Sequence, residues 1–135
     1  MGSFIKRHRY RKIIAVDFDG TLSLGKFPAC GPANEELVTL IRNILKHSSI
    51  ERPWLVLWTS REGDALKAAV DWLAELGIVF DAINESPKKS DFGVSRKLSA
   101  DLYIDDRAIK PEDFITQIKT RQLFISRNNI SFPLS

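Results

Sequence analysis

The sequence predicts a single three-layer α/β/α domain built on a mainly parallel sheet. Short apolar runs alternate with segments whose apolar residues recur at helical spacing, which is the pattern of strand–helix–strand units. A length of 135 residues suits one domain with a substantial core. Hydrophobic residues make up 44% of the chain and charged residues 27%, a composition that argues against wholesale disorder.

The predicted strands are short apolar runs that end at polar residues. Runs without polar alternation are typical of strands buried on both faces of a parallel sheet. Four such strands are expected at 12–18, 54–58, 78–83 and 102–104, and a final short strand is expected at 123–125.

Helices are expected between these strands. Asn34 is a good N-cap, and the apolar residues after it recur at helical spacing as far as about residue 47. A second apolar stripe covers residues 66–76 and ends at Gly77. Pro111 suits the first turn of a third helix.

The strongest functional signal is the sequence Asp17-Phe18-Asp19-Gly20-Thr21, which follows directly on the apolar run of the first strand. Residues i and i+2 of a strand point the same way, so Asp17 and Asp19 are expected at one edge with Phe18 turned the other way. Ligands of open α/β sheets gather at the carboxyl ends of strands. Neighbouring carboxylates repel unless a cation or proton offsets them, and these oxygen ligands indicate a hard divalent ion, Mg²⁺.

Polar residues also follow the second and fourth predicted strands. They are Thr59, Ser60, Arg61, Asp105 and Asp106. Lys97 lies in a polar segment, 86–97, that is predicted to be a loop with a short helical turn before the fourth strand. Because the carboxyl ends of parallel strands meet at one edge of a sheet, the sequence predicts one shared site.

The Asp17–Thr21 motif, followed in order by Thr59, Lys97 and the Asp105-Asp106 pair, resembles the haloacid dehalogenase-like (HAD) superfamily of phosphohydrolases. The resemblance spans roughly residues 12–110. It implies a Rossmann-like catalytic core over 12–135, preceded by a basic segment at 1–11. Lys97 is taken as the motif lysine because it shortly precedes the fourth strand, with Lys88 and Lys89 as the alternatives.

The resemblance implies a Mg²⁺-dependent phosphatase that forms an aspartyl-phosphate. Asp17 would be the nucleophile that attacks phosphorus. Asp19 would protonate the leaving oxygen and then activate water, and its backbone carbonyl would be a metal ligand. Thr59 would hydrogen-bond a phosphoryl oxygen, and Lys97 would bring positive charge to the nucleophile and the phosphoryl group.

The resemblance also implies the other members of the site. Asp17 and Asp105 would bind the metal through their side chains, and Asp106 would be an outer-shell ligand or would orient Lys97. The residues expected to bind substrate are Gly20, Thr21, Ser60 and Arg61.

Ordinary structural roles remain open for several of these residues. Thr59 is also a candidate helix N-cap, and Lys97 is also a candidate surface lysine. Asp105 and Asp106 are also candidate caps of a turn before Pro111. Arg61 and Arg107 are either substrate contacts or partners in structural ion pairs.

No cap domain is predicted. The stretches between the motifs hold only enough residues for single helices, strands and loops. An open site suits a bulky phosphorylated substrate, unless another subunit of a homo-oligomer covers it. Residues 22–31, which include Phe27, are predicted to form a flap over the site.

Charge leaves other functional classes open. The net charge of +3 is uneven, because the first twelve residues carry +5 and the remainder −2. The basic start is either a contact for a phosphate-rich partner or a solvated tail. The alternatives are a nucleic-acid end-processing phosphatase and a regulatory module that binds phosphate or metal without turnover. A response-regulator receiver is disfavoured because a receiver has its acidic pair early in the chain, whereas Asp105-Asp106 comes late here.

The sequence also predicts where the protein resides. No apolar stretch approaches the roughly 20 residues that span a bilayer, and the start lacks the apolar region of a secretory signal. Cys30 is the only cysteine, so no intrachain disulfide can form. These features predict a cytoplasmic protein without a membrane partner.

Overall fold

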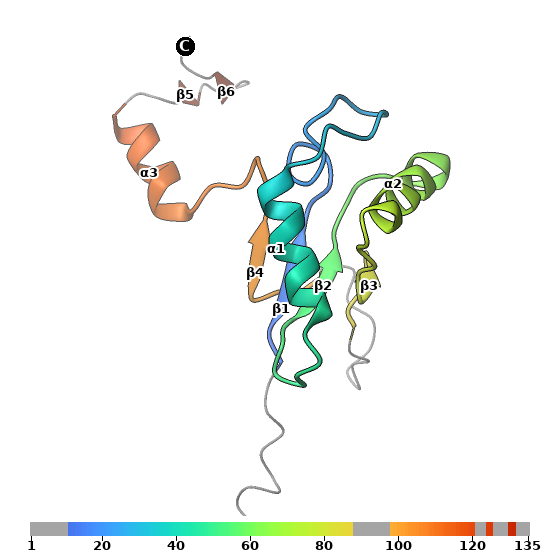
Figure 1. Cartoon of the computed structure of the whole chain (residues 1–135). Helices are drawn as coiled ribbons and strands as arrows, with labels where there is room; N and C mark the ends of the chain where they lie inside the picture. Colours follow the sequence, from blue (N-terminus) through green and yellow to red (C-terminus); the bar gives the residue numbers. More distant parts are fainter. Residues whose placement is uncertain (1–10, 88–97, 121–123, 126–129, 132–135) are drawn as a thin grey trace, which may run out of the picture.

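The computed structural model describes residues 11–87, 98–120, 124–125 and 130–131, and its core is a four-stranded parallel sheet (Figure 1). The strands are β1 (Ile13–Val16), β2 (Trp54–Leu57), β3 (Ala82–Ile83) and β4 (Leu102–Ile104), arranged in the order β3-β2-β1-β4. Each neighbouring pair is parallel. The predicted fold class, a single-domain α/β fold with a mainly parallel sheet, is confirmed.

The strand order creates a switch point between β1 and β4. The chain runs outward from β1 to β2 and β3, then returns to place β4 on the other side of β1. The loops that leave β1 and β4 therefore separate at the carboxyl edge, where open α/β sheets form ligand sites. Asp17 follows β1 and Asp105 follows β4, so the topology brings both to this point.

Two helices, α1 (Glu35–Lys46) and α2 (Gly63–Glu75), pack on the same face of the sheet. Asn34 begins α1 as predicted, because its side chain accepts a hydrogen bond from the Leu37 N–H at 3.3 Å. The core between helices and sheet is apolar: Val16, Phe18, Leu22, Val38, Ile41, Leu55, Leu57, Ala69, Leu73 and Ile78. This core fixes the strand ends from which the polar residues project.

The opposite face of the sheet packs on a smaller apolar cluster. Ile13, Ala15 and Val56 are buried there with Leu98, and two tryptophans pack against them, Trp54 and Trp58. The third helix, α3 (Pro111–Lys119), begins at the predicted proline, but none of its residues is buried. Figure 1 shows α3 beyond β4, away from α1 and α2. Within the described residues, the packed helices therefore lie on one face, and the second helix layer of the predicted α/β/α arrangement is not found there.

One strand prediction is corrected by the structure, and another is confirmed. The run 78–83 is a strand only at Ala82–Ile83, because its start closes α2 instead. The Ile78 N–H donates to the Leu73 carbonyl at 2.9 Å, and Gly77 has φ +80°. The strand expected at 123–125 is found as β5 (Phe124–Ile125), antiparallel to β6 (Ile130–Ser131), which was not predicted.

The segments between the motifs form no second folded unit in the part of the chain that the structure describes. Between β1 and β2 there is a loop and α1, and between β2 and β3 there is α2. None of the helices described is long and apolar enough to cross a membrane.

Candidate active site

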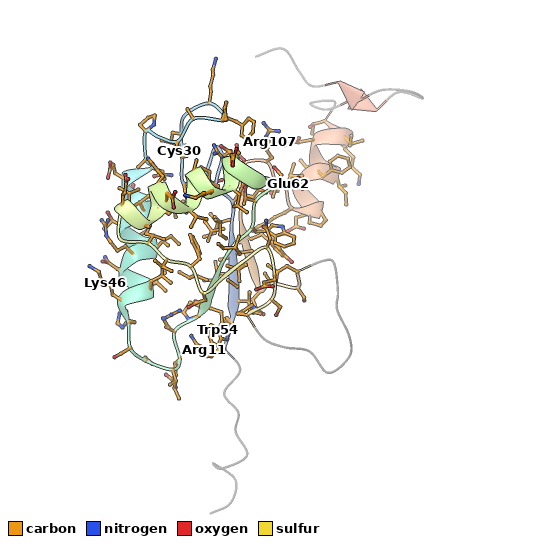
Figure 2. All side chains as sticks on the ribbon, turned by 90° about the vertical axis from the view of Figure 1, so that its right-hand side faces the viewer. Arg11, Cys30, Lys46, Trp54, Glu62 and Arg107 are labelled. Atoms are coloured by element: carbon orange, nitrogen blue, oxygen red, sulfur yellow. The ribbon has the colours of Figure 1, made fainter. Side chains whose placement is uncertain are left out.

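A cavity of about 880 Å³ opens at the carboxyl edge of the sheet. It is lined by residues that follow β1, β2 and β4 and by the loop that precedes α1: Asp17, Asp19, Gly20, Gly25, Lys26, Phe27, Trp58, Thr59, Ser60, Asp105, Asp106 and Arg107. Figure 2 shows Arg107, Glu62 and Cys30 at this end of the molecule, and Arg11 and Trp54 at the other. The cavity therefore collects most of the residues predicted to share a site.

Asp17 is placed by the end of β1. Its backbone N–H donates to the Ile104 carbonyl at 2.9 Å, which ties the end of β1 to the end of β4. Phe18 points into the core, is fully buried and packs edge-on against Trp72 with ring centroids 5.6 Å apart. Asp19 lines the same cavity as Asp17. The predicted alternation of the two aspartates around Phe18 is confirmed.

Three aspartates meet at the switch point. Asp17, Asp105 and Asp106 each offer a carboxylate oxygen, and these oxygens lie within 4.8 Å of one another. Asp105 Oδ1 accepts a hydrogen bond from the Arg107 N–H at 2.9 Å. No ion pair joins these three carboxylates to a basic side chain among the residues that the structure describes.

Gly20 is required by the close approach of Asp106. A Cβ atom at position 20 would lie 2.1 Å from Asp106 Oδ2 and 2.7 Å from Asp106 Cγ. The backbone there has φ +80°, a conformation that favours glycine. The glycine of the motif therefore makes room for the Asp106 carboxylate beside Asp17.

The electrostatics of Asp17 reflect this crowding. Burial is the largest cause that raises the pKa of Asp17, and the carboxylates of Asp105, Asp106 and Asp19 add to it. A hydrogen bond from the Phe18 backbone lowers the pKa only in part, so it stands at about 6. A cation at this point would offset the negative charge.

The residues present fit a hard divalent cation. All three groups offer carboxylate oxygens, the ligand type that Mg²⁺ prefers. The Asp19 side chain does not belong to this group, and the predicted contribution of its backbone carbonyl stays a prediction. A carboxylate oxygen of Asp106 lies within 4.8 Å of oxygens of Asp17 and Asp105, so the set of possible ligands includes Asp106 as well as Asp105.

Asp19 is paired with Arg61. The Arg61 Nη2 and Nε atoms donate to Asp19 Oδ1 at 2.8 Å and to Oδ2 at 2.9 Å. The hydrogen bond with Asp19 raises the pKa of Arg61, although burial opposes this. The Arg61 side chain has no exposed surface, whereas that of Asp19 is 31% exposed. The buried Arg61 thus orients the Asp19 carboxylate, which remains open to the cavity.

The contacts of Arg61 favour the structural ion pair over the predicted contact with substrate. Its guanidinium also donates to the carbonyls of Pro28 at 3.1 Å, Ala29 at 3.0 Å and Ala65 at 3.0 Å. It does not line the cavity. Arg61 is therefore a structural ion-pair residue, because the N–H groups of its guanidinium already donate hydrogen bonds within the protein.

Thr59 and Ser60 line the cavity as predicted. Thr59 does not cap a helix, because α2 begins later, with Glu62 as its N-cap. Instead the Thr59 Oγ1 accepts from the Arg61 N–H at 3.1 Å, and the Thr59 N–H donates to Asn84 Oδ1 at 2.8 Å. Sequence reasoning missed Asn84. The sequence feature that could have indicated Asn84 is its place directly after a strand. Asparagine also tolerates the φ of +55° that the backbone has there.

The predicted roles of Thr21 and Lys97 have different outcomes. Thr21 is buried, with 6% exposure, and does not line the cavity, so its predicted contact with substrate is not supported. The turn that follows Asp19 carries it inward, where its N–H donates to the Phe18 carbonyl at 3.2 Å. Lys97, with its alternatives Lys88 and Lys89, lies outside the described residues.

The predicted flap contributes to the cavity through Gly25, Lys26 and Phe27. Of these three residues, only Phe27 was singled out from the sequence. Trp58 packs against the smaller cluster and also lines the cavity. The lining therefore combines carboxylates, basic groups and two aromatic rings.

Comparison with known proteins gives one relative. No protein-family model and no curated protein matches the chain. A solved structure described as "Structure of the conserved protein coded by locus from Bacteroides thetaiotaomicron" matches with a TM-score of 0.60 and 36% sequence identity. The match covers 83% of this chain and 92% of that chain. Since identity at this level extends over most of both lengths, this chain belongs to the same family as the conserved Bacteroides protein.

Proposed function

We propose that the protein is a Mg²⁺-dependent phosphomonoester hydrolase of the HAD-like type that acts through an aspartyl-phosphate. One observation carries the proposal: Asp17, directly after β1, lines a cavity together with Asp19, and β4 brings the Asp105-Asp106 pair beside Asp17. Carboxylates gathered at the switch point of a parallel sheet match the order and placement that the motif implies.

The metal would be held by Asp17, Asp105 and Asp106, whose oxygens already converge. Bound there, Mg²⁺ would offset the negative charge that the phosphate and the three carboxylates bring together. Thr59 and Ser60, which follow β2 and also line the cavity, would hydrogen-bond phosphoryl oxygens.

The reaction has two steps in this proposal. A carboxylate oxygen of Asp17 attacks phosphorus, the bond between phosphorus and the ester oxygen breaks, and Asp19 gives a proton to the departing oxygen. Water then attacks the aspartyl-phosphate while Asp19 takes its proton, which releases inorganic phosphate and restores Asp17. Arg61 orients Asp19 for both transfers through its bidentate hydrogen bonds.

The test measures phosphate release from an aryl phosphate and a panel of alkyl esters, with Mg²⁺ and with EDTA. Asp17→Asn preserves the shape of the side chain but removes the nucleophile, so we expect turnover to fall at least about 10³-fold. Asp71→Asn is the matched control, because Asp71 pairs with Lys67 on the exposed surface of α2. Metal-independent release, or equal activity of Asp17→Asn, would overturn the proposal.

The nucleic-acid alternative receives less support. Arg11, the last residue of the basic segment, lies at the end of the molecule opposite the cavity (Figure 2). Its guanidinium stacks 3.5 Å from the Trp54 ring centroid, and its Nε donates to the Arg52 carbonyl at 3.0 Å. A regulatory module without turnover is the remaining alternative, and the same assay decides it. A cytoplasmic location stays part of the proposal.

A further inference from the structure

Phe27 is an exposed aromatic side chain at the cavity. It lies in the loop between β1 and α1, lines the cavity and is 60% exposed. Removing apolar surface from water is favourable, so an exposed aromatic ring in a cavity marks a surface that a ligand can cover. Leu24, in the same loop, is 54% exposed but does not line the cavity, which makes it a matched reference.

Arg61 holds Phe27 in place. Its Cζ atom lies 5.0 Å from the centroid of the Phe27 ring, within cation–π range. The same guanidinium donates to the carbonyls of the next two residues, Pro28 and Ala29. Because the Arg61 side chain is fully buried, its charge cannot leave these acceptors without a large cost. The ring is therefore pre-organised, which reduces the entropy lost when a ligand stacks on it.

The loop that carries Phe27 is also closed on itself. Ser23 Oγ accepts from the Gly31 N–H at 2.8 Å, and the Leu24 N–H donates to the Pro32 carbonyl at 2.8 Å. A Cβ atom at Gly25 would lie 1.8 Å from the Gly31 carbonyl oxygen, so the two arms of the loop are in direct contact. These contacts fix the base of the loop, as those of Arg61 fix its tip.

We infer that Phe27, positioned by Arg61, is a specificity-determining residue that selects phosphomonoesters carrying a flat aromatic group. The inference rests on the proposed phosphatase function, since the phosphate must react at Asp17. Trp58 offers a second aromatic surface in the same cavity, and Lys26 and Arg107 bring positive charge to it. Aromatic side chains stack on other rings and on every nucleobase. The cavity thus combines charge for a phosphate with a surface for a planar ring.

The test compares pairs of esters that leave from the same kind of alcohol. A nucleoside 5′-monophosphate and ribose 5-phosphate both release phosphate from a primary alcohol, so their intrinsic reactivities are similar. Phenylethyl phosphate and cyclohexylethyl phosphate form a second pair, in which both rings are apolar but only one is flat. The measured quantity is the ratio of kcat/KM within each pair in the presence of Mg²⁺.

We expect wild type to favour the flat member by about 5- to 100-fold, the range of one stacking contact. Phe27→Ala should remove most of this preference, Phe27→Trp should retain it and Leu24→Ala should not change it. Arg61→Lys should also lower the ratio, because the loop carbonyls lose their donors while Phe27 itself is intact. A preference for the flat member in both pairs indicates that the site accepts any aromatic ring. A preference in the nucleotide pair alone indicates that the site selects a nucleobase.

Equal kcat/KM within both pairs, or a preference that survives in Phe27→Ala, overturns the inference and leaves the phosphatase function standing. Absence of phosphate release from all four esters counts against the phosphatase function instead. Calorimetric binding of the same esters then decides: a Phe27-dependent preference for the flat members supports the platform, and its absence overturns it. If Arg61→Lys does not fold, the Phe27 and Leu24 variants carry the test.

Discussion

At the amino end of the sheet, Asp81 accepts hydrogen bonds from Nη1 and Nη2 of Arg52 at 2.8 and 2.9 Å. At the carboxyl end, Asp19 makes the same kind of bidentate pair with Arg61, also at 2.8 and 2.9 Å. The pairs differ in which partner meets water. Arg52 and Asp81 are 17% and 15% exposed, whereas Arg61 is 0% and Asp19 31% exposed.

Asp81 is enclosed by a further hydrogen bond, from the Leu55 N–H at 2.8 Å, and so links the starts of β2 and β3. Burial tends to raise the pKa of Asp81, but the hydrogen bonds from Arg52 and Leu55 outweigh it and hold the pKa below its ordinary value. A carboxylate in this state serves structure. The comparison shows that an ion pair of the same kind leaves its carboxylate open to a cavity when only the cation is enclosed.

The largest expected effect tests whether the carboxyl-end pair serves chemistry. Asp19→Asn should slow turnover by about 10²- to 10⁴-fold, because the proton donor and acceptor is lost. The loss should be greatest for esters with poor leaving groups, which need the proton most. The readout is kcat against the leaving-group pKa of a series of aryl and alkyl phosphates. An equal loss along the series would argue against the acid role.

A second prediction concerns the carboxylates that have no basic partner among the described residues. Gly20→Ala should displace the Asp106 carboxylate, because the new Cβ would lie 2.1 Å from Oδ2. We expect Mg²⁺ affinity to fall by about 10- to 100-fold, as when a metal ligand loses its orientation. Titration calorimetry with Mg²⁺ measures this directly.

Gly77→Ala is the matched control for Gly20→Ala. Gly77 has the same φ of +80°, but its nearest contact for a Cβ is Arg42 Cδ at 3.4 Å. Both variants should lose about 1 kcal/mol of stability from backbone strain. Only Gly20→Ala should lose Mg²⁺ affinity, and a similar loss in Gly77→Ala would show that strain, not Asp106, is responsible.

The sequence predicted the parts of the site that depend on local periodicity. Asp17 and Asp19 line the cavity while Phe18 points into the core, as the alternation of an extended backbone predicts. Asp105 reaches Asp17 because parallel strands end at a common edge, and Asn34 caps α1 because capping depends on the next few residues. Each of these inferences needs only neighbours in sequence or one rule of sheet topology.

The pairing of Arg61 with Asp19 was not predictable in the same way. The two residues are 42 positions apart, and Arg61 reaches Asp19 only because the loop through Pro28 and Ala29 wraps its guanidinium. The burial of Thr21 was not predictable for a related reason, since the turn after Asp19 decides whether its side chain faces the cavity or the core. Such details depend on loop conformation, which leaves little trace in residue type.

The amino-end pair gives a smaller effect of the opposite kind. Asp81→Asn should cost about 1–3 kcal/mol of stability, because Arg52 and the Leu55 N–H lose a charged acceptor. For a chain of this length, this lowers Tm by roughly 3–10 °C. Turnover per folded molecule should be unchanged. A strong loss of kcat at a temperature where the variant is folded would contradict the division between the two ends.

The smallest expected effect is a pH dependence of stability that distinguishes Asp17 from Asp81. The pKa of Asp17 is about 6 in the folded protein and 3.8 in the ordinary state, so the folded protein holds more protons between these values. In EDTA, the contribution of Asp17 to stability is therefore lost as pH rises from about 4 to about 6. Asp17→Asn should consequently melt a few degrees above wild type in EDTA at pH 7.5, and the difference should vanish near pH 4.

Mg²⁺ should reverse that order. It should raise the Tm of wild type at pH 7.5 but not that of Asp17→Asn, and the gain should shrink below pH 6 as protons compete for Asp17. Asp71→Asn should follow wild type throughout, because its partner Lys67 lies on the surface. If Asp17→Asn has the same Tm as wild type in EDTA at every pH, then the pKa of Asp17 is not raised in the folded protein. The contrast between Asp17 and Asp81 would then rest on geometry alone.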